Sequence, residues 1–143
     1  AEGRGLTMGL VSGMMFKSIP SRFDFAETVT KVRQAAADSG WTVPQVLDLQ
    51  EHYHHQGLSD MGGAMVVYFC NARSGFDITR SDGDKPMLVM MPTAVVVYED
   101  PSGAVHVAHM NFGLMRHMFG GTVKKALSRA ARNMAQAMAA ISA

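Results

Sequence analysis

The chain has 143 residues, of which 13 are basic and 12 acidic, so its formal net charge at pH 7 is +1. This near balance gives no electrostatic reason to expect a nucleic acid or an anionic surface as a partner. A single cysteine excludes an internal disulfide bond and any multi-cysteine zinc cluster. No apolar run reaches the roughly 20 residues that a membrane-spanning helix needs, so we expect a soluble protein.

The beginning of the chain suggests export. It starts with Ala1 and Glu2 instead of an initiator methionine, as it would after cleavage of a signal peptide, although a trimmed sequence begins in the same way. We therefore expect a periplasmic or otherwise exported protein. Residues 1–13 contain four glycines without a clear period, which favours an N-terminal arm, followed by a single domain over residues 14–143.

The first strand and the first helix have clear signals. Residues 14–19 favour a strand that Pro20 stops. Asp24 followed three residues later by Glu27 predicts a capping box, and Gly40 suits the position after the last helical turn. Four apolar residues with helical spacing predict the face of this helix that packs on the core: Phe25, Val29, Val32 and Ala36.

The middle of the chain predicts two more strands with a short helix between them. Residues 41–47 favour an edge or bulged strand, because Pro44 cannot donate to a strand ladder. Asp48 and Glu51 predict a second capping box, opening a short helix that Gly57 ends. Residues 64–70 are apolar throughout and favour a central strand. Residues 71–86 are polar, with at most one helical turn at 76–80.

The last third of the chain predicts a hairpin and a long helix. A fourth strand is expected from Met87 past a bend at Pro92, then a turn at 99–103 and a returning strand at 104–110. Alternation along that last strand places His106, Ala108 and Met110 on one face, and Val105, Val107 and His109 on the other. Thr122 is expected to cap the final helix, whose apolar stripe comprises Val123, Leu127, Ala130, Met134, Met138 and Ile141.

This order of elements predicts the fold class. A strand and a helix precede four strands, a short helix interrupts those strands, and a long helix closes the chain. The economical arrangement is an α+β fold with a single antiparallel sheet of about five strands and two main helices on one face.

Four segments of the sequence carry a resemblance to a known family. They are Gly40-Trp41-Thr42-Val43, Leu47-Asp48-Leu49-Gln50, Phe69-Cys70-Asn71, and Pro92 followed by Val95-Val96-Val97-Tyr98-Glu99. In this order and spacing they resemble the bacterial family called domain of unknown function 302, over about residues 14–110. The resemblance implies an α/β sandwich similar to the TATA-binding-protein-like arrangement, with one sheet carrying two main helices, and a homodimer. It implies no established activity.

The chain departs from the family pattern at two positions. Cys70-Asn71 is followed by Ala72 where the family usually has proline, and Pro92 is followed by Thr93 where the family often has cysteine. A family role that needs two cysteines is therefore in doubt for this chain.

A tract rich in histidine and methionine is the first candidate site. The chain contains 13 methionines and six histidines, and the tract comprises His109, Met110, Met115, His117 and Met118. Thioether and imidazole donors suit Cu(I), our first expectation, and supply the axial ligands of b-type haem, our second. The absence of a Cys-x-x-Cys-His motif excludes covalent c-type haem. The alternative is that these methionines fill the core and the histidines are exposed.

The metal hypothesis predicts a class of function. We expect carriage, storage or electron transfer, with a redox protein or a metal donor as partner, and we do not expect a hydrolase. His52, His54 and His55 form a second candidate cluster beside Glu51, because His52 and His55 share one helix face; a solvated helix face is the alternative. Sequence does not show whether the two histidine zones meet.

Two other function classes stay open. One is a cofactor-free dimeric module that binds a small apolar ligand or a partner through methionine-lined surface. The other is a thiol enzyme or sulfur carrier in which Cys70, if exposed beside Arg73, has a lowered pKa; the alternative is an inert buried thiol. The basic residues of the last helix are interpreted as solvated surface: Lys124, Lys125, Arg129 and Arg132.

Overall fold

The structure is a computed structural model that describes residues 9–11 and 13–143. Most of the expected arm, residues 1–8 and 12, lies outside the described residues. The strand expected from Met14 begins later, because residues 13–15 are helical and β1 comprises Phe16–Pro20. Asn111 explains this start, since its side-chain amide and backbone N–H donate to the carbonyls of Met14 and Met15.

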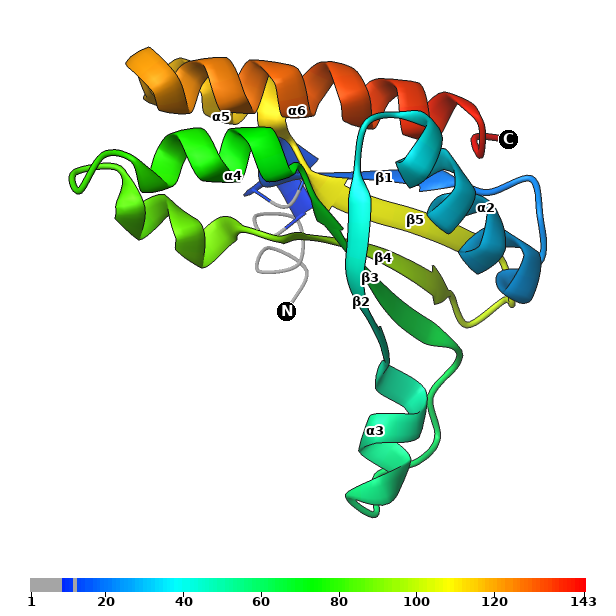
Figure 1. Ribbon diagram of the computed structural model, residues 1–143. Coiled ribbons are helices and arrows are strands. Elements are labelled where there is room, and N and C mark those ends of the chain that lie inside the picture. Colours follow the sequence, from blue (N-terminus) through cyan, green and yellow to red (C-terminus); the bar gives the residue numbers. More distant parts are fainter. Residues whose placement is uncertain (1–8, 12) are drawn as a thin grey trace.

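Five antiparallel strands form one sheet in the order β1-β5-β4-β3-β2. The other strands are β2 (Thr42–Asp48), β3 (Ala64–Cys70), β4 (Thr93–Glu99) and β5 (Val105–Met110). The two main helices, α2 (Phe25–Asp38) and α6 (Gly121–Ala139), lie over one face of the sheet, and α3 (Leu49–His55) projects from its other side (Figure 1). The predicted α+β class, with one five-stranded antiparallel sheet, is confirmed.

The core lies between that sheet face and the two helices. Along β4 and β5 burial alternates with period two, so that Val95, Val97 and Val107 are fully covered. Val32 of α2 and Met134 of α6 pack against them in the same apolar cluster. The predicted alternation of β5 is therefore confirmed. Burial of these apolar side chains on one face of the sheet also fixes the register of the strands.

Local signals in the sequence set the ends of the first two helices. Asp24 Oδ1 accepts from the backbone N–H of Glu27 at 2.8 Å, and Asp48 Oδ1 accepts from that of Glu51 at 3.0 Å. Gly40 has a φ of +81°, a conformation that favours glycine after a helix. β2 is an edge strand whose register shifts around Pro44, as predicted.

The segment before β4 differs from the prediction. Residues 71–86 hold two turns of helix, α4 (Ala72–Thr79), because Asn71 Oδ1 caps it by accepting from the N–H of Ser74 at 3.0 Å. The fourth strand does not begin near Met87, since Lys85–Met90 forms a 3₁₀ helix, η1, and β4 begins only at Thr93. Pro86 lies in the first turn of η1, where its fixed φ favours the start of a helix. Met87 and Met90 of η1 pack against the core cluster.

The approach to the last helix also differs from the prediction. α5 (Phe112–Met115) and a 3₁₀ turn, η2 (Arg116–Met118), precede α6. α6 begins at Gly121 and its N-cap is Gly120, which offers no side chain, so the expected Thr122 cap is wrong. Gly121 has a φ of +57°, a backbone conformation that glycine adopts without strain. The helix therefore begins at Gly121, before the predicted cap at Thr122. Among the described residues, no helix combines the length and hydropathy that crossing a membrane requires.

Candidate functional site

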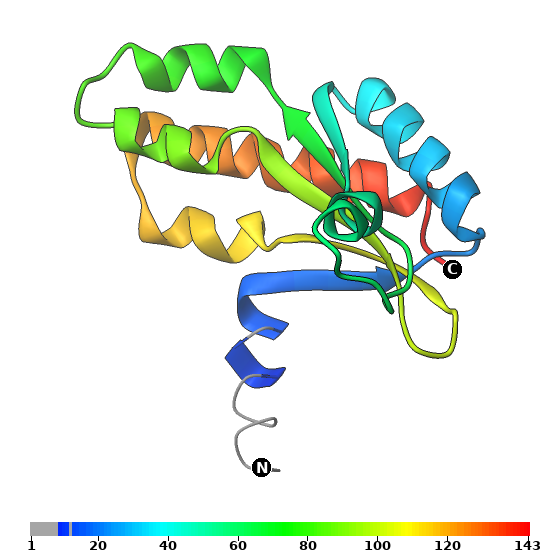
Figure 2. The same ribbon diagram turned by 90° about the horizontal axis from the view of Figure 1, so that it is seen from below.

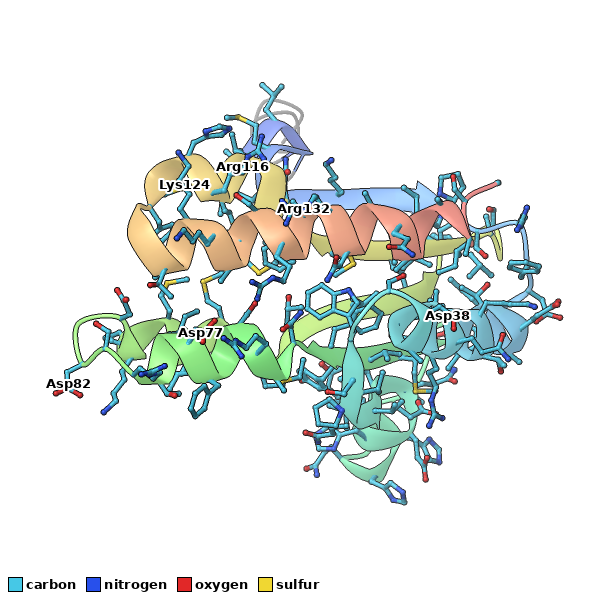
Figure 3. The ribbon with its side chains drawn as sticks, turned by 45° about the horizontal axis from the view of Figure 1, so that its top comes forward. Asp38, Asp77, Asp82, Arg116, Lys124 and Arg132 are labelled. Atoms are coloured by element: carbon cyan, nitrogen blue, oxygen red, sulfur yellow. The ribbon has the colours of Figure 1, made fainter. Side chains whose placement is uncertain are left out.

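An apolar cavity lies between α6 on one side and α4 with η1 on the other. Its volume is about 40 Å³, and the ends of β3 and β4 close it. Figure 3 shows sulfur-containing side chains in the space between these helices. Among its lining residues are Trp41, Cys70, Met87, Met90, Met91, Thr93, Phe112, Val123, Leu127 and Ala130.

Two residues that line this cavity each carry a buried polar atom without a partner among the described residues. Trp41 and Thr93 are each 6 % exposed, and neither Trp41 Nε1 nor Thr93 Oγ1 makes a hydrogen bond with the described residues. The Trp41 ring packs on Phe69 with 5.6 Å between the ring centroids, so the indole is held in place. A buried polar group left unpaired costs on the order of 1–3 kcal/mol. Two such groups on one apolar wall are what a polar ligand atom would satisfy.

Cys70 also lines the cavity, as a half-buried thiol at the end of β3. No histidine or carboxylate is among the lining residues. A base to activate the thiol is therefore absent from the described wall, and the sulfur-carrier role of Cys70 stays a prediction.

His109 lies in a separate cleft between β1, β5 and the C-terminal half of α6. The cleft has a volume of about 210 Å³, and its lining residues include Lys17, Ile19, Phe112, Met134 and Met138. His109 is only 9 % exposed, and its Nδ1 lies 2.9 Å from the carbonyl oxygen of Met110. Because a carbonyl only accepts, Nδ1 carries the proton and Nε2 keeps its lone pair.

The environment of His109 favours its neutral form. Burial lowers the pKa of the imidazole, and the ammonium group of Lys17 lowers that pKa further. The bond to the Met110 carbonyl raises the pKa, but less than burial lowers it. The ring is therefore a neutral base at pH 7, as a metal ligand must be.

The other residues of the predicted His/Met tract lie in different surroundings. Met110 is half-buried on the sheet face opposite His109, and Met115 of α5 is buried in the core. His117 and Met118 are exposed on η2, with Met118 71 % exposed. Of the tract as predicted, His109 and Met110 line this cleft, and His109 is the one that is buried.

The second histidine cluster is fully solvated. His52, His54 and His55 are exposed on α3, which projects away from the helical layer (Figure 1). His55 Nε2 lies 3.6 Å from Glu51 Oε1. Within the described part of the chain, no group of three or more His, Cys, Asp and Glu side chains is placed to hold a metal ion.

A polar cluster at the β4–β5 turn was not predicted from the sequence. Asp100 Oδ1 accepts from the N–H groups of Ser102 and Ala104, and Asp100 Oδ2 lies 2.8 Å from His106 Nε2. The bonds to Ser102 and His106 hold the pKa of the Asp100 carboxyl well below its usual range. The His106 ring stacks on Tyr98, with 5.2 Å between the ring centroids. These contacts stabilise the turn. An Asp-x-Ser-Gly turn whose aspartate lies six residues before a strand histidine is too common a pattern to predict them.

The basic residues of α6 are mostly solvated, as the sequence indicated. Lys124, Lys125 and Arg132 are exposed, and Figure 3 shows Lys124 and Arg132 on the outer side of the helix. Arg129 is the exception, because its Nη1 donates to Ser74 Oγ at 2.8 Å and ties α6 to α4.

One open antiparallel sheet, two helices over one face and a cavity under the longer helix define a small α+β domain. The profile of the family described as "Domain of unknown function DUF302" matches residues 17–141, and the chain belongs to that family. A solved structure described as that of an uncharacterized conserved protein DUF302 from Bacillus stearothermophilus has the same fold, with a TM-score of 0.76. It is 15 % identical in sequence, and the match covers 89 % of this chain and 98 % of that one. A comparison with curated proteins finds no match.

Proposed function

We propose that this protein is a binding module for a small, largely apolar molecule that carries one hydrogen-bond acceptor oxygen. The cavity between α6 and the α4–η1 segment is the binding site. The observation that carries the proposal is the pair of unpartnered polar atoms, Trp41 Nε1 and Thr93 Oγ1, on two residues that line this largely apolar cavity.

The two polar atoms set the chemistry of the ligand. An indole N–H only donates, whereas a threonine hydroxyl both donates and accepts. A ligand oxygen that accepts from Trp41 therefore satisfies the stricter of the two groups. The rest of the ligand would lie against apolar side chains such as Met87, Phe112 and Leu127. A small alcohol, ketone or ester fits this description.

Entry of such a ligand requires the methionine side chains to move. A cavity of about 40 Å³ is smaller than the roughly 150 Å³ of an engineered cavity that accepts benzene. Met87, Met90 and Met91 form one side of the cavity, and methionine changes conformation at low cost. Met87, Met90 and Met91 belong to or follow η1, a 3₁₀ helix, whose hydrogen bonds are poorer than those of an α-helix. We therefore expect the methionine side of the cavity to move when a ligand enters.

The test compares benzyl alcohol with toluene, which has the same ring but no oxygen, by calorimetric titration of the full chain. We expect saturable binding of benzyl alcohol and weaker binding of toluene. Ala130→Leu fills the cavity and is expected to abolish binding. Ala139→Leu makes the same change at an exposed position of α6 and is the matched control. Equal binding by the parent and the Ala130→Leu variant contradicts the proposed site.

We also propose that the module is a homodimer formed through the sheet face that lies opposite α2 and α6. Figure 2 shows this face from below, with α3 projecting in front of part of it. Ala108, Val96 and Leu47 lie in one row across it and are half-buried, and exposed Phe16 lies at its edge. Contiguous apolar surface of this kind marks interaction sites. Sedimentation equilibrium is expected to give a dimer for the parent and a monomer for Val96→Lys; a monomeric parent contradicts the proposal.

Export, a haem cofactor and a redox partner stay predictions.

A further inference from the structure

The cleft that contains His109 has a second, separate chemistry. Its buried imidazole faces a helix that contributes two methionines, Met134 and Met138, to the same cleft. These methionines are 1 % and 6 % exposed and lie one helical turn apart. We propose that His109 Nε2 and the thioether sulfurs of Met134 and Met138 form a binding site for Cu(I).

The imidazole is oriented as a ligand would be. Metal-binding histidines commonly donate their second ring N–H to a backbone carbonyl, which fixes the ring and the tautomer. His109 has this arrangement, since Nδ1 donates to the Met110 carbonyl at 2.9 Å. Nε2 makes no hydrogen bond with the described residues, and it is not one of their enclosed unpaired atoms, although His109 as a whole is only 9 % exposed. Its lone pair is therefore accessible from the cleft and available to a ligand.

The donor set selects the metal. Neutral thioethers and an imidazole are soft donors that suit Cu(I), whereas hard cations require carboxylate or carbonyl oxygens. No carboxylate lines the described cleft. The positive charge of Lys17, which lines the same cleft, repels a monovalent ion less than a divalent one.

This proposed ligand set differs from the partners of His109 that the sequence suggested, and those partners stay a prediction. Met115 lies in the core and His117 and Met118 are exposed, whereas Met134 and Met138 come from a helix that follows the tract. The Cu(I) site can be tested separately from the proposed ligand cavity. His109, Met134 and Met138 do not line the cavity, and the methionines of the cavity do not line the cleft.

The experiment is an anaerobic Cu(I) titration against a chromophoric Cu(I) chelator, with the full chain carrying Cys70→Ser so that no thiolate competes. We expect one Cu(I) per chain. Met134→Leu combined with Met138→Leu conserves volume and so preserves the fold. This double variant is expected to lower the affinity by at least about tenfold, the range seen when support of a metal site is lost.

The matched control replaces the cavity methionines instead. Met87→Leu combined with Met90→Leu is expected to leave the Cu(I) affinity unchanged. X-ray absorption of the bound form is expected to show one nitrogen and two sulfur neighbours. The proposal is overturned if the Cys70→Ser chain takes up no Cu(I), or if the Met134/Met138 variant binds it as tightly as its parent. Neither result bears on the binding of benzyl alcohol to the cavity.

Discussion

Thr93 shows how one side chain can cost stability and still fit a function. Its side chain is buried, and its hydroxyl has no partner among the described residues. Such a group is retained against its cost when it contacts a ligand, which is the usual trade between stability and activity. The burial of Thr93 could not be predicted from the sequence, because the cavity that it lines is formed by β3, β4 and α6, which are distant from one another in the chain.

Replacement of this hydroxyl should stabilise the protein. Thr93→Val keeps the shape of the side chain and removes the unpaired group, so we expect the free energy of unfolding to rise by about 1 kcal/mol. Urea denaturation measures this change. The control is Thr42→Val, which removes an exposed hydroxyl that donates to the Cys70 carbonyl at 3.1 Å and should not stabilise. A less stable Thr93→Val variant would mean that the hydroxyl has a partner in solution.

His109 makes stability depend on pH in a direction that its burial fixes. Its pKa is lowered from 6.5 in the folded state, so the unfolded chain binds the proton more readily. The contribution of His109 is therefore complete above pH 6.5 and is lost as the pH falls below that value. We expect the urea midpoint to fall between pH 7.5 and pH 5.5, and His109→Gln to flatten this dependence in metal-free buffer. An equal fall in the variant would assign the effect to other groups.

At the scale of elements, the sequence predicted those parts whose signals are local. The caps of α2 and α3, the bulged edge strand and the alternation of β5 each depend on residues a few positions apart. The start of β4 was predicted wrongly, because a short apolar run such as Met87–Met91 fits a buried strand or a helical segment equally well. Packing of Met87 and Met90 against the core cluster, whose members come from distant parts of the sequence, accompanies the helical outcome.

The β4–β5 hairpin gives a prediction at this scale. Asp100→Asn weakens the contacts that the carboxylate makes with the amides of Ser102 and Ala104 and with His106. We expect faster hydrogen exchange at the Ala104 amide, while that of Val97 in the core stays protected. Since the folded pKa of Asp100 is lowered, the parent keeps this protection at neutral pH and loses it only as the pH falls below 3.8. Unchanged exchange at Ala104 in the variant would show that the backbone alone holds the turn.

At the scale of the whole molecule, α6 organises two sites along its length. Its N-terminal half, around Val123 and Leu127, covers the apolar cavity, and its C-terminal half, with Met134 and Met138, covers the histidine cleft. The sequence predicted this stripe only as core. Neither site is visible in it, because the lining of each comes from strands and helices far apart in the chain. His109 could be predicted as a candidate ligand, since it stands out by residue type alone.

The central claim, that the cavity binds an acceptor oxygen, is tested most directly at Trp41. It is the only tryptophan of the chain, so its indole N–H gives a single identifiable proton resonance. Titration with benzyl alcohol is expected to move this resonance downfield to saturation, as a new hydrogen bond requires, whereas toluene is expected to leave its N–H unbonded. An indole resonance that responds equally to both compounds, or to neither, would contradict the account.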